Sequence, residues 1–127
     1  MKITFCPVKT TAAKLAKIVE VGTTHFNKGE PILFLVSDDA SWEFLDKLFW
    51  TLPAESFLPH PCKLIQVRHS LDPAYATVFN LSPAPLLQET IKIIYELEDH
   101  TSPDKLKASQ DRYHAYRAQE RQIIVSG

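Results

Sequence analysis

Glycine is scarce in this sequence, and its positions leave no place for the usual phosphate-binding loops. The chain of 127 residues contains three glycines, at positions 22, 29 and 127. None of them follows the first apolar segment, where a nucleotide-binding turn needs glycine so that the backbone can approach phosphate closely. No serine carries the flanking glycines of a hydrolase nucleophile elbow either. These absences argue against a nucleotide-dependent enzyme.

Cysteine and metal-ligand clusters are scarce as well. Cys6 and Cys62 lie far apart without the spacing of a metal site, so both are expected to be reduced thiols in a cytoplasmic protein. None of the five histidines pairs with a Cys, an Asp or another His at ligand spacing. Neither a metal nor another cofactor is therefore expected.

Excess charge and long apolar runs are also missing. The net charge is −1, so no overall field draws the molecule to nucleic acid, and any such binding needs a local patch. No apolar run approaches the roughly 20 residues of a membrane-spanning helix, and the first residues lack a signal-type apolar segment. No membrane association is expected. The length and the 45% hydrophobic content predict one globular domain over residues 1–127.

Apolar segments of strand type alternate with segments of helical periodicity. Strands are predicted at residues 2–8, 31–36, 63–68, 76–81 and 91–97. Helices are predicted from residue 12 to about 26, from 42 to 52 and from 103 to about 121. This order is typical of an α/β fold, here a three-layer α/β/α sandwich with a mainly parallel five-stranded sheet. Residues 76–97 leave little room for a crossover helix, so part of the sheet is expected to be antiparallel. Residues 123–125 are expected to dock on the body as a short apolar end.

The segment from residue 42 to residue 60 concentrates apolar and aromatic side chains. At roughly 100° per residue, six of them fall within an arc of about 160° that is expected to face the core: Trp42, Phe44, Leu45, Leu48, Phe49 and Leu52. Trp50 lies outside this arc, and Phe57, Leu58 and Pro59 follow on a loop beyond the helix stop at Pro53. The loop either folds back over Trp50 or forms a hydrophobic docking patch with it. Helix geometry alone favours neither arrangement.

The predicted last helix carries a basic ridge on one flank. Five polar residues fall within an arc of about 80° on the helical wheel: Lys107, Gln110, His114, Arg117 and Arg121. Tyr113 borders this flank, whereas Tyr116 belongs to the stripe expected to face inward. A basic ridge beside an aromatic side chain suits an acidic peptide that ends in an apolar residue, or a phosphate backbone. The alternative is a solvated helix face without a partner.

Two acidic groups invite a catalytic interpretation that the sequence does not support. Asp38 and Asp39 follow the second strand, where ligands often bind in α/β folds, but helix capping accounts for them. Glu96, Glu98 and Asp99 are expected to form a solvated strand end. An acid–base pair with the next histidine is conceivable there, and nothing selects it. No catalytic residue is therefore predicted.

Two stretches together resemble the chi subunit of bacterial DNA polymerase III. Residues 48–60 contain Leu-Phe-Trp at the helix end, then Pro, Glu-Ser-Phe and Pro-His, and residues 112–117 read Arg-Tyr-His-Ala-Tyr-Arg. The family pattern is a helix ending in Leu-Trp, then Pro, Glu-Ser-Phe and Pro-His, with Arg-Tyr-x-x-Tyr-Arg on a terminal helix. The order of predicted elements is also similar, so the resemblance covers nearly the whole chain.

The resemblance implies a fold, a role and two partners. The fold is related to nucleotide-binding folds but lacks their phosphate loop, and the role is that of a non-catalytic accessory subunit. The partners are the psi subunit, or an equivalent clamp-loader component, and the acidic C-terminal tail of single-stranded DNA-binding protein. Contact with single-stranded DNA would then be indirect.

The resemblance also implies positions for the two sites. The psi site would use Trp50 and Phe57, with Leu58 and Pro59 adjacent. The tail site would use Tyr113 together with the ridge residues Lys107, Gln110, His114, Arg117 and Arg121. The family often has Arg where Gln110 stands and Lys where His114 stands. Tail binding is therefore expected to be weaker, pH-sensitive or shifted.

Two other functions remain open from the sequence. One is an adaptor for a helicase or repair factor that uses the same aromatic patch. The other is a module that binds single-stranded DNA directly through the ridge and the tyrosines. The near-neutral net charge argues against strong direct binding.

Overall fold

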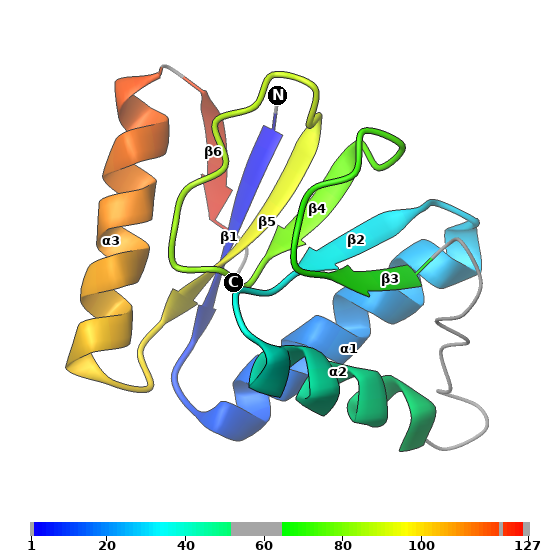
Figure 1. The fold of residues 1–127 in the computed structure, drawn as a ribbon. Coiled ribbons are helices and arrows are strands. Elements are labelled where there is room, and N and C mark those ends of the chain that lie inside the picture. The colour runs from blue at the N-terminus through cyan, green and yellow to red at the C-terminus, as the bar shows by residue number, and fades with distance from the viewer. Residues whose placement is uncertain (1, 52–64, 120, 126–127) are drawn as a thin grey trace.

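The computed structural model describes residues 2–51, 65–119 and 121–125, with side chains at all of these except residues 49–51 (Figure 1). These ranges form β1 (Lys2–Val8), α1 (Thr11–Lys28), β2 (Ile32–Leu35), α2 (Asp39–Thr51), β3 (Ile65–Arg68), β4 (Thr77–Asn80), β5 (Ile93–Asp99), α3 (Pro103–Ala118) and β6 (Gln122–Val125). The strands pair in the order β3-β2-β4-β5-β1-β6, and each of these pairs is parallel.

Short capping residues set the ends of the helices. The Thr10 hydroxyl accepts a hydrogen bond of 3.0 Å from the Ala13 amide at the start of α1. The Asp38 carboxylate accepts one of 2.6 Å from the Ser41 amide at the start of α2, so its predicted capping role is confirmed. α1 ends at Lys28 and is capped by Gly29, whose φ of 67° lies in the left-handed region that glycine adopts without strain.

The sheet buries apolar side chains on both faces, because successive residues of a strand point to opposite sides. One core cluster includes Phe34 and Leu45 and lies between the sheet and helices α1 and α2. The other includes Ile94 and Tyr116 and lies on the opposite face, with α3 and loop residues. Figure 1 shows α1 and α2 on one side of the sheet and α3 on the other. The predicted three-layer sandwich is therefore confirmed.

The sheet differs from the prediction in its number of strands and in its strand directions. The described part of the chain forms six strands rather than five, because Gln122–Val125 pairs with β1 as a parallel edge strand. The outer edge of β1 would otherwise leave backbone N–H and C=O groups unpaired. Every strand pair within the described ranges is parallel, including β4 with β5, and the chain joins these two strands through a loop.

Two expectations about side chains are wrong. Phe44 is 53% exposed, because the buried stripe of α2 is narrower than the predicted arc and includes Leu45. Glu96 and Asp99 do not form a solvated strand end, since both are buried. α3 covers this end of β5: Ser109 accepts a hydrogen bond from the Asp99 amide and Arg112 donates to Glu96.

Candidate partner-binding site

A cavity of about 220 Å³ lies between α3 and the edge of the sheet formed by β1 and β6. Its helix side includes Gln110, Tyr113 and His114, three of the residues predicted for the tail site. Phe5 of β1 and Val125 of β6 line the sheet side. The cavity thus combines an apolar wall with polar helix residues, a composition that suits a short peptide.

Tyr113 contacts one aromatic and one cationic side chain. Its ring packs edge-on against Phe5, with 5.5 Å between the ring centroids. The guanidinium carbon of Arg117 lies 6.0 Å from the Tyr113 ring centroid. Arg117 Nη1 also donates a long hydrogen bond of 3.4 Å to the Tyr113 hydroxyl. The Tyr113 side chain is partly exposed, so it presents aromatic surface to the cavity and a cation beside it.

The predicted ridge is present on α3 except at its last position. Arg121 does not lie on the helix, because α3 ends at Ala118. Instead Arg121 Nη2 donates a hydrogen bond of 2.8 Å to the carbonyl oxygen of Leu87. The wheel placed Arg121 on the ridge because the predicted helix was too long. The other four residues are exposed: Lys107, Gln110, His114 and Arg117.

Four residues that line the cavity were absent from the predicted site: Phe5, Glu98, Ser109 and Val125. Phe5 points to the same face as Ile3, so strand alternation alone could have assigned its side of the sheet. Val125 lies on β6, which was not predicted as a strand. Glu98 brings a carboxylate to the wall and pairs with Nε2 of His100 at 3.3 Å. An acidic ligand must therefore direct its own charges away from Glu98.

The similarity of this chain to known proteins decides its family. Residues 1–123 match the family model described as DNA polymerase III chi subunit, HolC. The chain belongs to this chi family. A comparison with curated proteins finds no match. Chi is an accessory subunit of DNA polymerase III, which places this chi protein in DNA replication.

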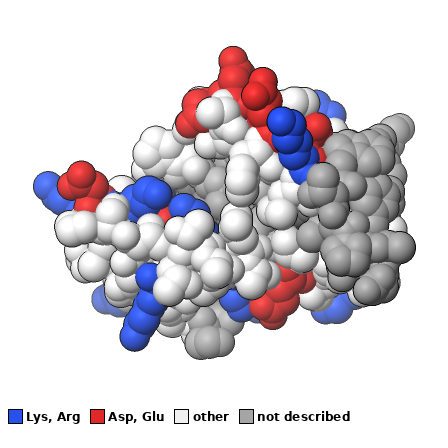
Figure 2. All heavy atoms as spheres, turned by 90° about the horizontal axis from the view of Figure 1, so that it is seen from below, with Lys and Arg blue, Asp and Glu red and all other residues white. Residues whose placement is uncertain are grey.

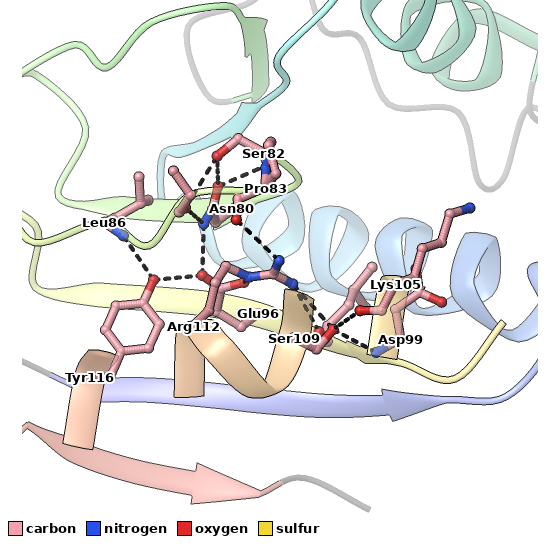
Figure 3. A network of polar contacts seen from close by, with 12 residues as sticks. Asn80, Ser82, Pro83, Leu86, Glu96, Asp99, Lys105, Ser109, Arg112 and Tyr116 are labelled. Atoms are coloured by element: carbon pink, nitrogen blue, oxygen red, sulfur yellow. Dashed lines mark hydrogen bonds and ion pairs between the residues drawn. The ribbon is translucent and has the colours of Figure 1, made fainter. Parts of the chain in front are cut away.

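In this chi protein, a buried polar network anchors α3 to the sheet (Figure 3). The Glu96 carboxylate accepts hydrogen bonds from Arg112 Nε at 2.9 Å, from Asn80 Nδ2 at 2.7 Å and from the Tyr116 hydroxyl at 2.5 Å. The Tyr116 hydroxyl in turn accepts from the Leu86 amide at 2.9 Å. Because Arg112 and Tyr116 lie one turn apart, these bonds fix the rotation of α3 and hence the direction of Tyr113.

The charges in the network depend on one another. Burial raises the pKa of Glu96 above its ordinary value, while the Arg112 guanidinium and the hydrogen bonds from Tyr116 and Asn80 act in the opposite direction. Burial and the neighbouring Glu96 carboxylate raise the pKa of Tyr116, so its hydroxyl remains a donor. The inward position predicted for Tyr116 is confirmed, since its side chain is fully buried.

The second predicted site of chi is only partly within the described chain. Trp50 lies in the last turn of α2, but its side chain is outside the described set. Phe57, Leu58 and Pro59 also lie outside the described residues. Within the described ranges, no helix is long and apolar enough to cross a membrane. The same ranges hold no cluster of three or more His, Cys, Asp or Glu side chains placed to bind a metal ion.

Proposed function

We propose that this chi protein is a non-catalytic subunit that links the clamp-loader complex to single-stranded DNA-binding protein. The cavity beside α3 is the observation that carries the proposal. Its apolar wall of Phe5 and Val125 lies beside Tyr113, and exposed cations follow along the same helix. An acidic peptide tail that ends in an apolar residue would place this residue against the apolar wall and its acidic side chains near the cations.

The charge around the cavity determines how strongly such a tail binds. Positive charge comes from Lys107 and Arg117, which are exposed on α3, whereas Gln110 in the cavity wall is neutral. The Glu98 carboxylate lines the strand side of the cavity and repels an acidic ligand there. Exposed ion pairs are individually weak and are screened by salt. Affinity for the tail should therefore be modest and should fall as salt rises.

Direct binding of single-stranded DNA is less well supported than binding of the tail. Stacking on bases needs exposed aromatic side chains. Tyr116 is fully buried and donates its hydroxyl to Glu96, which leaves Tyr113 as the aromatic side chain that α3 exposes in part. Chi would then reach single-stranded DNA through its partner.

Calorimetric titration with the C-terminal peptide of the cognate single-stranded DNA-binding protein tests the tail site. Tyr113→Ala should weaken binding at least about tenfold, as expected for an aromatic at the centre of a small interface. Phe44→Ala is the matched control, because it removes an exposed aromatic from α2 on the other face of the sheet. This control should bind the peptide like the unsubstituted protein.

A substitution that should strengthen peptide binding also tests the tail site. His114→Lys adds a permanent positive charge to the cavity wall and should strengthen peptide binding about threefold at low salt. The gain should shrink at high salt, because the added charge is exposed. The proposal is wrong if the folded, unsubstituted protein does not bind the peptide, or if Tyr113→Ala binds it equally well.

The link to the clamp loader rests on the resemblance described above. By position, the psi subunit or an equivalent component would contact Trp50 and Phe57, with Leu58 and Pro59 beside them. Two partners on one small protein would connect the polymerase assembly to the coated single strand without a catalytic step in chi itself.

A further inference from the structure

A second cavity, of about 290 Å³, lies at the carboxyl ends of the central strands. It is bordered by Asn80 at the end of β4, by Leu97 and Asp99 on β5, and by side chains of both α1 and α3. Figure 2 looks onto this end of the molecule and shows a hollow with Lys and Arg atoms at its edge. This cavity is separate from the proposed tail site, which lies between α3 and β6.

The topology of the sheet explains why a cavity forms at this position. β5 and β1 are neighbours in the sheet, but their connections leave on opposite faces. The chain runs from β1 through α1 to β2 on one face and from β5 through α3 to β6 on the other. A crevice therefore opens between the two helices beyond the strand ends, where open α/β sheets commonly bind ligands.

Arg112 presents hydrogen-bond donors at the wall of this cavity (Figure 3). Its side chain is fixed through Nε, which bonds to the buried Glu96 carboxylate at 2.9 Å, and the residue is only 7% exposed. The outer nitrogens make longer contacts, of 3.5 Å from Nη1 to the Pro83 carbonyl, 3.4 Å from Nη2 to the Leu97 carbonyl and 3.3 Å from Nη2 to the Ser109 hydroxyl. Bonds of this length are weak, so a charged acceptor would make better ones.

The remaining charged groups of the cavity also favour an anion. Lys14, Lys105 and Arg112 line it together with the Asp99 carboxylate, and Arg112 also pairs with the buried Glu96 carboxylate, so the cations exceed the carboxylates by one. The Asp99 carboxylate already accepts from Lys14 Nζ at 2.8 Å and from the amide and hydroxyl of Thr101. Lys105 forms no ion pair among the described residues and is exposed. Its ammonium group is therefore available to a ligand.

The cavity adjoins a smaller recess whose lining is partly apolar. This recess, of about 130 Å³, shares Lys14 and Leu81 with the cavity and is lined further by Ser41 and by the apolar side chains of Ile18, Val36 and Leu45. An anion at the polar end could thus extend an apolar group into the recess. We propose that chi binds a small phosphate monoester here, with the phosphate at Arg112 and Lys105 and the apolar part toward Leu81 and Leu45.

This proposal can be tested by nuclear magnetic resonance titration of the full chain. The probes are phenyl phosphate and inorganic phosphate, added at constant ionic strength. Saturable shifts are expected at the amides of Ser82, Asp99 and Lys105, with phenyl phosphate binding about tenfold more tightly than phosphate because its ring enters the recess. Lys105→Gln should weaken phenyl phosphate binding about fivefold, since it removes one charged donor.

Lys107→Gln is the matched control, because it removes the same charge from the same helix outside the cavity. It should bind phenyl phosphate like the unsubstituted protein. Equal weakening by both substitutions would show a general charge effect and overturn the site. Shifts that map to Tyr113 and His114, or shifts that do not saturate, would also overturn it. Equal affinity for the two probes would overturn the role of the apolar recess. The tail-peptide experiment probes a different cavity, so either proposal can fail alone.

Discussion

The carboxylate of Glu96 is fully buried between β5 and α3, where it pairs with Arg112. Glu96→Gln keeps the shape of the side chain but leaves the Arg112 guanidinium buried without its counter-charge. Breaking a buried ion pair in this way costs about 3–5 kcal/mol. We expect the free energy of unfolding to fall by about 3 kcal/mol, because the amide oxygen still accepts one hydrogen bond. Urea denaturation followed by circular dichroism measures the change.

Glu98→Gln provides the comparison for this prediction. The substitution removes the same charge two residues away, where the carboxylate is partly exposed and pairs with His100. Its effect on the free energy of unfolding should stay within about 0.5 kcal/mol. Equal losses in the two variants would contradict the role of the buried pair in anchoring α3.

Asp99 makes the stability of the protein depend on pH in the acid range. Burial acts to raise the pKa of this carboxyl, but the hydrogen bonds from Lys14 and Thr101 outweigh it and hold the pKa at about 2, below the ordinary 3.8. A depressed folded-state pKa contributes stability that is present above the unfolded value and lost as pH falls through the folded value. This contribution, about 2 kcal/mol, should therefore disappear between about pH 4 and pH 2.

Asp99→Asn tests this pH dependence. The variant should be less stable than the unsubstituted protein at pH 6, and the difference should shrink as the pH falls toward 2. Urea denaturation at a series of pH values measures both free energies. Asp104→Asn, at an exposed position in the first turn of α3, should leave the pH profile unchanged. A constant difference between Asp99→Asn and the unsubstituted protein would contradict the prediction.

At the scale of elements, α2 is proposed to carry the clamp-loader contact at its carboxyl-terminal end. Trp50→Ala and Phe57→Ala should each leave the protein folded but weaken association with the psi subunit by about 2 kcal/mol or more, roughly thirtyfold, as at an aromatic hot spot. Sizing chromatography and calorimetry of the complex measure the loss. Phe44→Ala should bind psi normally. Unchanged affinity of both patch variants would remove the patch from the interface.

The elements themselves were largely predictable, and the misses have physical causes. β1 is rich in residues that favour strands, β2 has a continuous apolar sequence, and Ser102-Pro103 marks the start of α3. Local sequence signals were therefore enough to predict these elements. β6 was missed because its three apolar residues form a strand only when β1 offers them an edge. The parallel pairing of β4 with β5 was missed because a loop replaces the usual crossover helix.

The candidate site was only partly predictable because it combines distant segments. Helical periodicity placed Gln110, Tyr113 and His114 on one flank, and the cavity includes all three. The same periodicity gave no indication that Arg112 is buried, since its partner Glu96 is 16 positions away on β5. Phe5 and Glu98 reach the cavity through tertiary packing that a single helix does not encode.

At the scale of the whole molecule, the sheet separates α3, which carries the proposed tail site, from the described part of α2. α2 and α3 lie on opposite faces of the sheet, and Figure 1 shows the end of α2 and the length of α3 on opposite sides of the molecule. The buried network fixes α3 to β5, so the proposed tail site lies on a rigid part of the molecule. A rigid spacer of this kind can hold both partners at once.

Simultaneous binding gives the last prediction. The tail peptide should bind chi alone and the chi–psi complex with dissociation constants that agree within about twofold, because distant and independent sites act additively. Calorimetric titration of the peptide into each sample measures both constants. Tyr113→Ala should lose the peptide but keep psi, and Trp50→Ala should lose psi but keep the peptide. Competition between psi and the peptide would mean that the two sites overlap, and chi could not then bridge the clamp loader and the coated strand.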